Sequence, residues 1–479
     1  MAKRDYNLIA IGAGSAGLVT TYIGAAVKAK VALIEKHKMG GDCLNTGCVP
    51  SKALIKSASV LSHIKRHKEY GIRNATADVE FAEVMERVQT VIKKVEPHDS
   101  IERYTGLGVD CITGSAFIKS PNEIEVNGKT LTTNNLVIAT GARPFVPPIP
   151  GLDQVDFLTS DNVWNLREKP ERLVVLGGGP IGSELTQTFS RLGCKVTQIE
   201  KAPRPLNRED PECGDFIKKQ FVKEGVDVRT DTTCKSIEVE DGRQYAVVEK
   251  SGQEERIEFD KILVAVGRAP NTKGFGLEEL GVNLTKRGNI EVDDFLRSTS
   301  HSNIYACGDV AGPYQFTHTA AHQAWYCAVN SLLSPVKKFK VDYSVIPWCT
   351  FTDPEVARAG LSETEAKAQN IPYEVSTYGI DDLDRAIADS EDHGFVKVLT
   401  VPGKDKILGV TIMGHHAGDL IAEYVLAMKH GIGLNGILGT IHIYPTLAEA
   451  NKYAAGIWKK NHAPQGLLKL AQKFFNWRR

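Results

Sequence analysis

The sequence predicts an α/β protein with two βαβ domains and a C-terminal α+β domain. Three observations lead to this fold class. A glycine-rich turn between an apolar strand and a helix occurs twice, and the last part of the chain contains no such turn. The composition combines 43 glycines with only 7% aromatic residues. The 479 residues are sufficient for two to four domains of roughly 150 residues each.

The first βαβ unit lies between Tyr6 and Glu35. An apolar strand leads into a glycine-rich turn, and a helix and a second strand follow. In Rossmann-like turns, three glycines allow a tight turn, close approach of a pyrophosphate and close packing of the helix on the strand. Here they are Gly12, Gly14 and Gly17. Because Glu35 ends the second strand, its carboxylate can accept hydrogen bonds from ribose hydroxyls, and the unit predicts a dinucleotide site.

The same arrangement recurs between Leu173 and Glu200. Its turn glycines are Gly177, Gly179 and Gly182. Two dinucleotide sites in one chain indicate two cofactors that exchange electrons. Glu200 would bond a free 2′-hydroxyl and repel a 2′-phosphate, which favours NADH. The nearby cations Lys201 and Arg204 keep NADPH as an alternative.

Glycine- and proline-rich segments indicate the domain boundaries. Gly141 and Gly267 each follow an apolar strand that returns from one of the βαβ domains. We expect residues 1–148 and 273–345 to form the first dinucleotide-binding domain, and 149–272 the second. Residues 346–461 are expected to form the α+β domain, followed by a basic amphipathic helix at 462–479.

Charge and cysteine content exclude several classes of protein. Lys plus Arg and Asp plus Glu number 58 each, so no net positive charge favours nucleic-acid binding. The uncharged run from Leu8 to Val27 is broken by glycines and reads as neither a signal peptide nor a membrane span. Nine cysteines in so long a chain do not make a disulfide framework. We therefore expect a cytoplasmic protein without a structural metal site.

Cys43 and Cys48 form the one closely spaced cysteine pair. A turn at Asn45-Thr46-Gly47 would bring the two thiols within disulfide distance. Pro50 suits the first turn of a helix, which would place Cys48 near the helix N-terminus with Lys52 one turn away. Both effects favour a thiolate, the form that attacks disulfides and binds soft metals.

The segment Gly-Gly-Asp-Cys43-Leu-Asn-Thr-Gly-Cys48-Val-Pro-Ser-Lys52 resembles the redox-disulfide motif of the pyridine nucleotide-disulfide oxidoreductases. This family includes dihydrolipoamide dehydrogenase, glutathione reductase and mercuric reductase. The resemblance covers about residues 5–455 in the family's order of motifs, including the Ala-x-Gly-Asp segment that ends at Asp309. It implies a homodimer in which residues 346–461 form the dimerisation domain.

The resemblance also implies FAD and NAD(P)H as cofactors, with roles for individual residues. The residues implied at FAD are Gly12, Gly14, Gly17, Glu35, Lys52, Ala116 near the adenine, Gly141, Asp309 at the ribityl chain and Thr317. Those implied at NAD(P)H are Gly177, Gly179, Gly182, Glu200 and Gly267. Lys52 and Glu184 would pair beside flavin N5. Cys48 would be the charge-transfer thiol and Cys43 the interchange thiol, and hydride would pass from NAD(P)H through FAD to their disulfide.

Tyr444 departs from the family pattern. Members that reduce organic disulfides carry His-Pro-Thr followed by a Glu, and here Tyr444 stands in place of the histidine, with Glu449 retained. A phenol with a pKa of about 10 is poorly matched to moving thiol protons near neutral pH, whereas imidazole at about 6.5 is well matched. Mercuric reductases resemble this chain at the tyrosine, so a soft metal ion bound by Cys43 and Cys48 is the favoured acceptor.

Two alternatives stay open for the acceptor chemistry. His442 would lie about 7 Å from Tyr444 on the same side of an extended segment and would supply the base of a dihydrolipoamide dehydrogenase. Against mercury, no cysteine follows Cys349, whereas mercuric reductases usually end in a Cys-Cys pair, and the chain begins directly at the flavin unit. We therefore expect both metal relays to be missing.

The C-terminal tail is basic and amphipathic. After Glu449 there is no acidic residue, and apolar residues between Leu467 and Trp477 recur at helical spacing. One interpretation is peripheral docking on an anionic membrane, on its inner face, by an electron-transfer flavoprotein. The other is a helix packed on the dimer, which we favour because core stripes are commoner.

Overall fold

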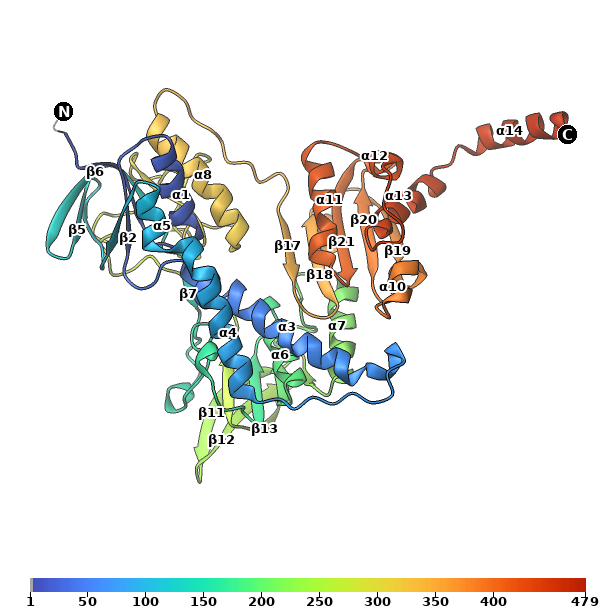
Figure 1. The fold of residues 1–479 in the computed structure, drawn as a ribbon, viewed down its shortest axis with the longest axis horizontal. Coiled ribbons are helices and arrows are strands. Elements are labelled where there is room, and N and C mark those ends of the chain that lie inside the picture. The colour runs from blue at the N-terminus through green and yellow to red at the C-terminus, as the bar shows by residue number, and fades with distance from the viewer. Residues whose placement is uncertain (1–2) are drawn as a thin grey trace. The chain divides into compact units, whose positions relative to one another are not determined.

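The computed structural model describes residues 3–479 and groups into two compact units. The first unit contains residues up to 65, 76–202 and 224–342. The second contains 66–75, 203–223 and 343–479. Figure 1 shows the helices and strands of both units.

A seven-stranded sheet forms the first part of the first unit, in the order β3-β2-β1-β6-β5-β4 with β16 paired to β6. Its strands are β1 (Tyr6–Ile11), β2 (Val31–Glu35), β3 (Val109–Thr113), β4 (Phe117–Ser120), β5 (Glu123–Val126), β6 (Lys129–Ile138) and β16 (Ile304–Ala306). Strands β1, β2, β3, β6 and β16 pair in parallel. Strands β1, β2 and β16 and the end of β6, from Leu136 to Ile138, are nearly continuous apolar runs, because both faces of such a sheet are buried there.

Some helices of this unit pack on the sheet, and others carry the redox segment and pack on one another. They are α1 (Ser15–Ala26), α2 (Gly41–Asn45), α3 (Cys48–Lys65), α4 (Phe81–Val95), α5 (Ile101–Gly106) and α8 (Thr317–Leu333). Figure 1 shows α1 and α8 side by side, and the two helices make extensive contact. The carboxyl ends of the parallel strands, where cofactors bind in such folds, therefore meet the N-termini of α1 and α8.

A second parallel sheet in the same unit has the order β10-β9-β8-β14. Its strands are β8 (Arg172–Leu176), β9 (Lys195–Ile199), β10 (Asp227–Arg229) and β14 (Lys261–Val264), with α6 (Pro180–Arg191) after β8. An antiparallel sheet of β11 (Thr233–Glu240), β12 (Arg243–Lys250) and β13 (Gln253–Phe259) packs with it in one core. Strands β7 (Ala142–Pro144) and β15 (Arg268–Pro270) form a short antiparallel ladder.

The second unit is built on a five-stranded antiparallel sheet in the order β17-β18-β21-β20-β19. Its strands are β17 (Pro347–Thr350), β18 (Glu355–Gly360), β19 (Glu374–Gly379), β20 (Phe395–Thr400) and β21 (Ile407–Gly414). Its helices are α7 (Pro211–Lys223), α9 (Glu363–Ala368), α10 (Asp384–Ala388), α11 (Ala417–Lys429), α12 (Leu434–Gly439), α13 (Glu449–Asn461) and α14 (Gln465–Arg478). Buried Lys397 on β20 pairs with Asp210 at 2.6 Å, which ties the start of α7 to this sheet.

The fold class predicted from the sequence is confirmed: two βαβ sheets precede an α+β unit. The reversal between the two redox cysteines differs from the predicted turn, because Asn45 ends one turn of helix α2 before the chain turns at Thr46. The Asn45 amide donates to the carbonyls of Met39 and Gly41 and holds that turn. Among residues 3–479, no helix combines the length and apolarity needed to cross a bilayer.

Candidate active site

The first glycine-rich turn and the redox segment lie directly against each other. A Cβ atom on Gly17 would lie 1.8 Å from the carbonyl oxygen of Gly12, so the helix can pack this closely only without a side chain. A Cβ on Gly41 would lie 2.6 Å from the Cα of Gly14, and the Gly40 amide donates to the Ala13 carbonyl at 2.9 Å. The predicted pyrophosphate turn therefore also supports the segment that carries the thiols.

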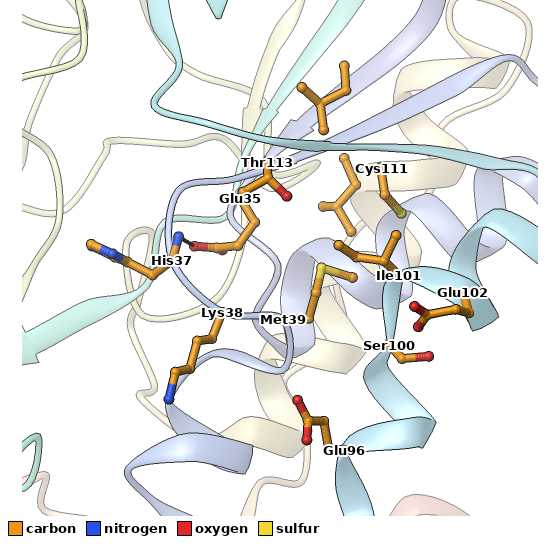
Figure 2. Close-up of a pocket in the computed structure, with 12 residues that line it drawn as sticks. Glu35, His37, Lys38, Met39, Glu96, Ser100, Ile101, Glu102, Cys111 and Thr113 are labelled. Carbon is orange, nitrogen blue, oxygen red and sulfur yellow. Dashed lines mark hydrogen bonds between the residues drawn. The ribbon is translucent and has the colours of Figure 1, made fainter. Parts of the chain in front are cut away.

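Glu35 ends β2 and organises the turn. Its carboxylate accepts hydrogen bonds from the backbone N–H groups of Ala13 at 2.7 Å and His37 at 2.8 Å. A carboxylate has about four lone-pair positions, so it retains acceptors for a ribose. A cavity of about 300 Å³ lies beside Glu35, bordered by Met39 and Cys111, as Figure 2 shows. The volume of this cavity and the free acceptor positions of Glu35 fit the adenosine end of a flavin dinucleotide. Ala116 packs at the edge of the neighbouring core.

The second glycine-rich turn, from Gly177 to Gly182, has the same close helix packing and the same kind of carboxylate contact as the first. A Cβ on Gly182 would lie 2.1 Å from the Gly177 carbonyl oxygen, and the Gly179 position has no neighbour within 4 Å. Glu200 accepts hydrogen bonds from the N–H groups of Gly178 and Ala202. The turn is therefore shaped for a second dinucleotide. Gly141 and Gly267 follow β6 and β14 with φ values of +66° and +149°, and a Cβ on either would meet nothing within 4 Å.

Cys43 in α2 and Cys48 at the first position of α3 are hydrogen-bonded to each other as thiols. The Thr317 hydroxyl lies 3.4 Å from the Cys48 sulfur, at the start of α8. Lys52, one turn into α3, forms an ion pair of 2.8 Å with Glu184 of α6. The N-termini of α3 and α8 thus both meet the Cys48 sulfur, and both helix dipoles favour negative charge there.

The two thiols have opposite acidities. The hydrogen bond from Cys43 is the main cause that lowers the pKa of Cys48, and Thr317 and the charge of Lys52 lower it further against the effect of burial. The same hydrogen bond, together with burial, raises the pKa of Cys43. Cys48 is therefore the thiolate of the pair and Cys43 the proton donor.

Arg268 is a member of this site that sequence reasoning missed. Its guanidinium pairs with Asp42, next to Cys43, and lies 3.5 Å from the carboxylate of Asp309. Burial raises the pKa of Asp309, and the charge of Arg268 opposes that shift. Trp164 was also missed; its indole N–H donates to the Thr46 carbonyl at 2.9 Å. The Gly267-Arg268 sequence after an apolar strand was the available signal for the arginine.

Tyr444 and Glu449 lie together in the second unit, around a cavity of about 260 Å³. The Tyr444 hydroxyl donates to Asp384 at 3.0 Å, and this hydrogen bond is the main cause that raises the pKa of the phenol. Glu449 is buried at the start of α13, where it accepts hydrogen bonds from Tyr453 and from the Thr446 N–H. The phenol is therefore held protonated, and Asp384 is a third residue that sequence reasoning missed.

The expectation that His442 shares a side with Tyr444 is wrong for the described chain. The His442 side chain is 6% exposed and its Nε2 lies 2.9 Å from the Glu423 carboxylate, whereas Tyr444 is 65% exposed and bonded to Asp384. The segment is not a strand: a bend at Tyr444 and Pro445 precedes α13 and directs the two side chains to different partners.

Similar solved structures share this fold. The HOCl-induced flavoprotein disulfide reductase RclA from Escherichia coli is 27% identical, with a TM-score of 0.84 over 94% of this chain and 100% of that one. A Cu(II) complex of the same reductase gives 26% identity and a TM-score of 0.83 over 95% and 99% of the two chains.

Curated relatives fall into two activities at similar distance. A mercuric reductase from Staphylococcus aureus is 34% identical over 458 residues, covering 95% of this chain and 83% of the relative. A dihydrolipoyl dehydrogenase from Staphylococcus aureus is 36% identical over 457 residues, covering 94% and 96%. Residues 6–324 match the model of the pyridine nucleotide-disulphide oxidoreductases, and residues 346–455 match the dimerisation domain of that family. The chain therefore belongs to the pyridine nucleotide-disulphide oxidoreductases, a family of FAD-dependent enzymes.

Proposed function

We propose that this protein is a homodimeric, NAD(P)H-dependent reductase that passes electrons through FAD and the Cys43–Cys48 pair to a soft metal ion. The observation that carries the proposal is the Tyr444 hydroxyl bonded to Asp384, at the position where reductases of organic disulfides use histidine. The Cys43–Cys48 dithiol can transfer an electron pair. The residue at the position used for proton transfer, in contrast, is a neutral phenol.

FAD, when bound, would take a hydride from NAD(P)H and deliver an electron pair to the disulfide. The residues of the chain supply the binding and the charge. Gly14 and Gly41 pack against each other and so hold the glycine-rich turn beside the redox segment, and Glu35 offers acceptors to a ribose. Lys52, paired with Glu184, places a positive charge near Cys48 and stabilises the thiolate that disulfide cleavage releases.

Electrons and protons balance when NAD(P)H reduces a divalent soft metal ion through the Cys43–Cys48 disulfide. Reduction of the disulfide consumes NAD(P)H and one proton and gives two thiols. Cys43 and Cys48 then bind the ion as thiolates, release two protons and return to the disulfide as the ion takes two electrons. One Hg²⁺ would become Hg⁰, or two Cu²⁺ would become two Cu⁺. Both protons leave from thiols to solvent, so no acid must protonate a departing substrate thiol.

In the proposed dimer, the C-terminal domain of one subunit supplies Tyr444 and Glu449 to the thiols of the other, as the family pattern implies. Asp384 fixes the Tyr444 ring by the 3.0 Å hydrogen bond and keeps its proton in place. A protonated phenol beside the thiols can donate a hydrogen bond or give the ion an oxygen contact. It cannot cycle a proton readily at neutral pH.

The test is anaerobic NADH consumption with three acceptors: mercuric ion in excess thiol, cupric ion and oxidised lipoamide. The proposal expects rapid consumption with at least one metal ion and slow consumption with lipoamide. A Cys43→Ser variant controls for direct reaction of the metal with the flavin. Rapid turnover with lipoamide alone would refute the proposed acceptor.

We also propose a preference for NADH, based on Glu200. Glu200 directly follows β9, and its carboxylate lies at the second glycine-rich turn, where it would repel a 2′-phosphate. Glu200→Ala should lower the ratio of kcat/KM for NADH to that for NADPH by about fivefold. Glu35→Ala is the matched control: it should weaken FAD retention and leave that ratio unchanged. An unchanged ratio in Glu200→Ala would remove this role.

A dihydrolipoamide dehydrogenase is the second candidate, and one observation favours it. His442 Nε2 lies 2.9 Å from Glu423, a histidine and carboxylate pair of the kind that orients a catalytic base. Its Nδ1 lies 3.0 Å from the Thr440 carbonyl, so a role as base requires that contact to open. In this case His442→Gln should abolish lipoamide turnover. Retention of that turnover would leave His442 as a packing residue.

A further inference from the structure

The last helix, α14, leaves its whole surface uncovered. None of the residues between Gln465 and Arg478 is buried in the described chain. Large apolar side chains are among the most exposed: Leu467 at 64%, Leu470 at 63%, Phe475 at 60% and Trp477 at 80%. Figure 1 shows α14 as a separate rod at the C-terminus, after the break at His462–Pro464. Exposed apolar side chains in one continuous group indicate a surface that binds something.

The helix separates apolar and polar side chains onto two faces. At 100° per residue, its leucines, Ala471, phenylalanines and Trp477 cover an arc of about 180°. The opposite arc carries Lys469, Gln472, Lys473 and Asn476. Arg478 lies near the middle of the apolar arc, at the C-terminal end of the helix, where its guanidinium stacks on the Phe474 ring at 5.6 Å from the centroid.

The charge of this region has one sign. No acidic residue occurs between residues 450 and 479, and the cations are Lys452, Lys459, Lys460, Lys469, Lys473, Arg478 and Arg479. The complementary partner is therefore an anionic surface that also accepts a broad apolar face. A bilayer with acidic phospholipids has both properties, because its headgroups are negative and its acyl region begins just beneath them.

The length of the helix favours lying on the membrane over crossing it. Fourteen residues extend about 21 Å, shorter than the roughly 30 Å of hydrocarbon that a span must cross. Trp477 and the two phenylalanines are residues that prefer the level of the headgroups. Lysine side chains on the polar face can extend to lipid phosphates while their alkyl chains stay near the apolar region.

We propose that α14 docks the enzyme on the surface of bilayers that contain anionic phospholipid. The helix lies parallel to the surface, with Leu467, Phe474 and Trp477 in the headgroup and acyl boundary and with Lys469 and Lys473 toward the phosphates. The proposal is independent of the electron acceptor, because it places no residue of α14 in the redox site.

Co-sedimentation of the full-length, FAD-loaded protein with vesicles tests the proposal. Phosphatidylcholine vesicles are compared with vesicles that also contain phosphatidylglycerol. We expect at least about tenfold more bound protein with phosphatidylglycerol, and loss of that binding at high salt. A Phe474→Ser/Trp477→Ser variant should lose binding, and Lys469→Gln/Lys473→Gln should lose about as much as high salt removes.

Lys93→Gln/Lys94→Gln is the matched control, because these two lysines are exposed on α4. It should bind as the unaltered protein does, and all variants should keep the same FAD content and dimer mass. Failure of the protein to bind phosphatidylglycerol vesicles at low salt would overturn the proposal. So would a dimer that dissociates in Phe474→Ser/Trp477→Ser, since the apolar face would then be covered by the second subunit.

Discussion

The dithiol segment and the Tyr444 group are two reactive regions that control protons in opposite ways. At the dithiol, Cys43, Thr317 and Lys52 lower the pKa of Cys48 and so favour loss of a proton. At the phenol, Asp384 raises the pKa of Tyr444 and so favours its retention. One region offers a thiolate, and the other withholds the exchangeable proton that an organic disulfide needs.

This difference indicates what kind of acceptor suits the protein. Reduction of an organic disulfide requires a proton for each departing thiol, and a base with a pKa near neutral pH supplies it. A metal ion bound by two thiolates has no such requirement. The asymmetry between Cys48 and Tyr444 therefore favours a soft metal over lipoamide, and each prediction below changes one side of it.

Cys48→Ser should have the largest effect. A serine hydroxyl neither forms the disulfide nor ionises near neutral pH, so turnover with every acceptor should fall by at least about 1,000-fold. FAD should stay bound, and the long-wavelength absorbance that a thiolate beside an oxidised flavin produces should disappear. Cys234→Ser, a half-buried cysteine on β11, is the matched control and should keep both activity and absorbance. Persistence of the band in Cys48→Ser would assign the thiolate elsewhere.

Tyr444→His should supply the base that the Tyr444 region lacks. We expect kcat/KM for oxidised lipoamide to rise about 10- to 100-fold, because imidazole can cycle the thiol proton near neutral pH. Tyr444→Phe separates the two effects, since it removes the hydroxyl without adding a base and should leave lipoamide turnover low. An equal gain in both variants would show that the phenol acts only by its bulk.

Lys52→Met should make the Cys48 thiol less acidic. The pKa of Cys48 should rise when the Lys52 charge is removed, so a smaller fraction is thiolate at neutral pH and metal reduction should slow about tenfold. Since only the thiolate binds the metal, activity falls as pH drops through the pKa of Cys48, and in this variant the fall should begin at higher pH. Lys56→Met, one turn further along α3 and exposed, should leave the pH profile in place.

Asp384→Asn should have the smallest effect. The amide oxygen can still accept the Tyr444 hydrogen bond, so metal reduction at neutral pH should change by less than about threefold. Because the carboxylate raises the pKa of Tyr444, its removal should move ionisation of the phenol, read from the alkaline limb of the rate profile, to lower pH. Asp382→Asn, at the same cavity, is the control and should not move that limb.

Much of the fold could be predicted because its signals are local. Each βαβ unit is specified by glycines and an acid within about thirty residues, and the redox segment by one run from Gly40 to Lys52. The sequence also indicated a helical C-terminal tail, and α14 is a helix that lies uncovered in the described single chain.

The missed contacts join residues far apart in the sequence. Thr317 reaches Cys48 across 269 positions, Arg268 reaches Asp42 across 226, and Asp384 reaches Tyr444 across 60. No periodicity or spacing rule connects such positions, because the packing of separate elements within each unit brings them together. The raised pKa of Tyr444 depends on the long-range contact with Asp384, whereas the main cause that lowers the pKa of Cys48 is its near neighbour Cys43, with Thr317 adding a long-range contribution. Sequence alone therefore named the tyrosine without showing what holds it.

Single-turnover oxidation of the reduced enzyme tests the acceptor most directly. The protein is reduced anaerobically with one equivalent of NADH and then mixed with mercuric ion, cupric ion or oxidised lipoamide, and the loss of thiols is followed in time. The account predicts that a metal ion reoxidises the Cys43–Cys48 pair rapidly, with one mercuric or two cupric ions consumed per pair, while lipoamide leaves the thiols reduced. Rapid reoxidation by lipoamide, with the metals inert, would contradict it.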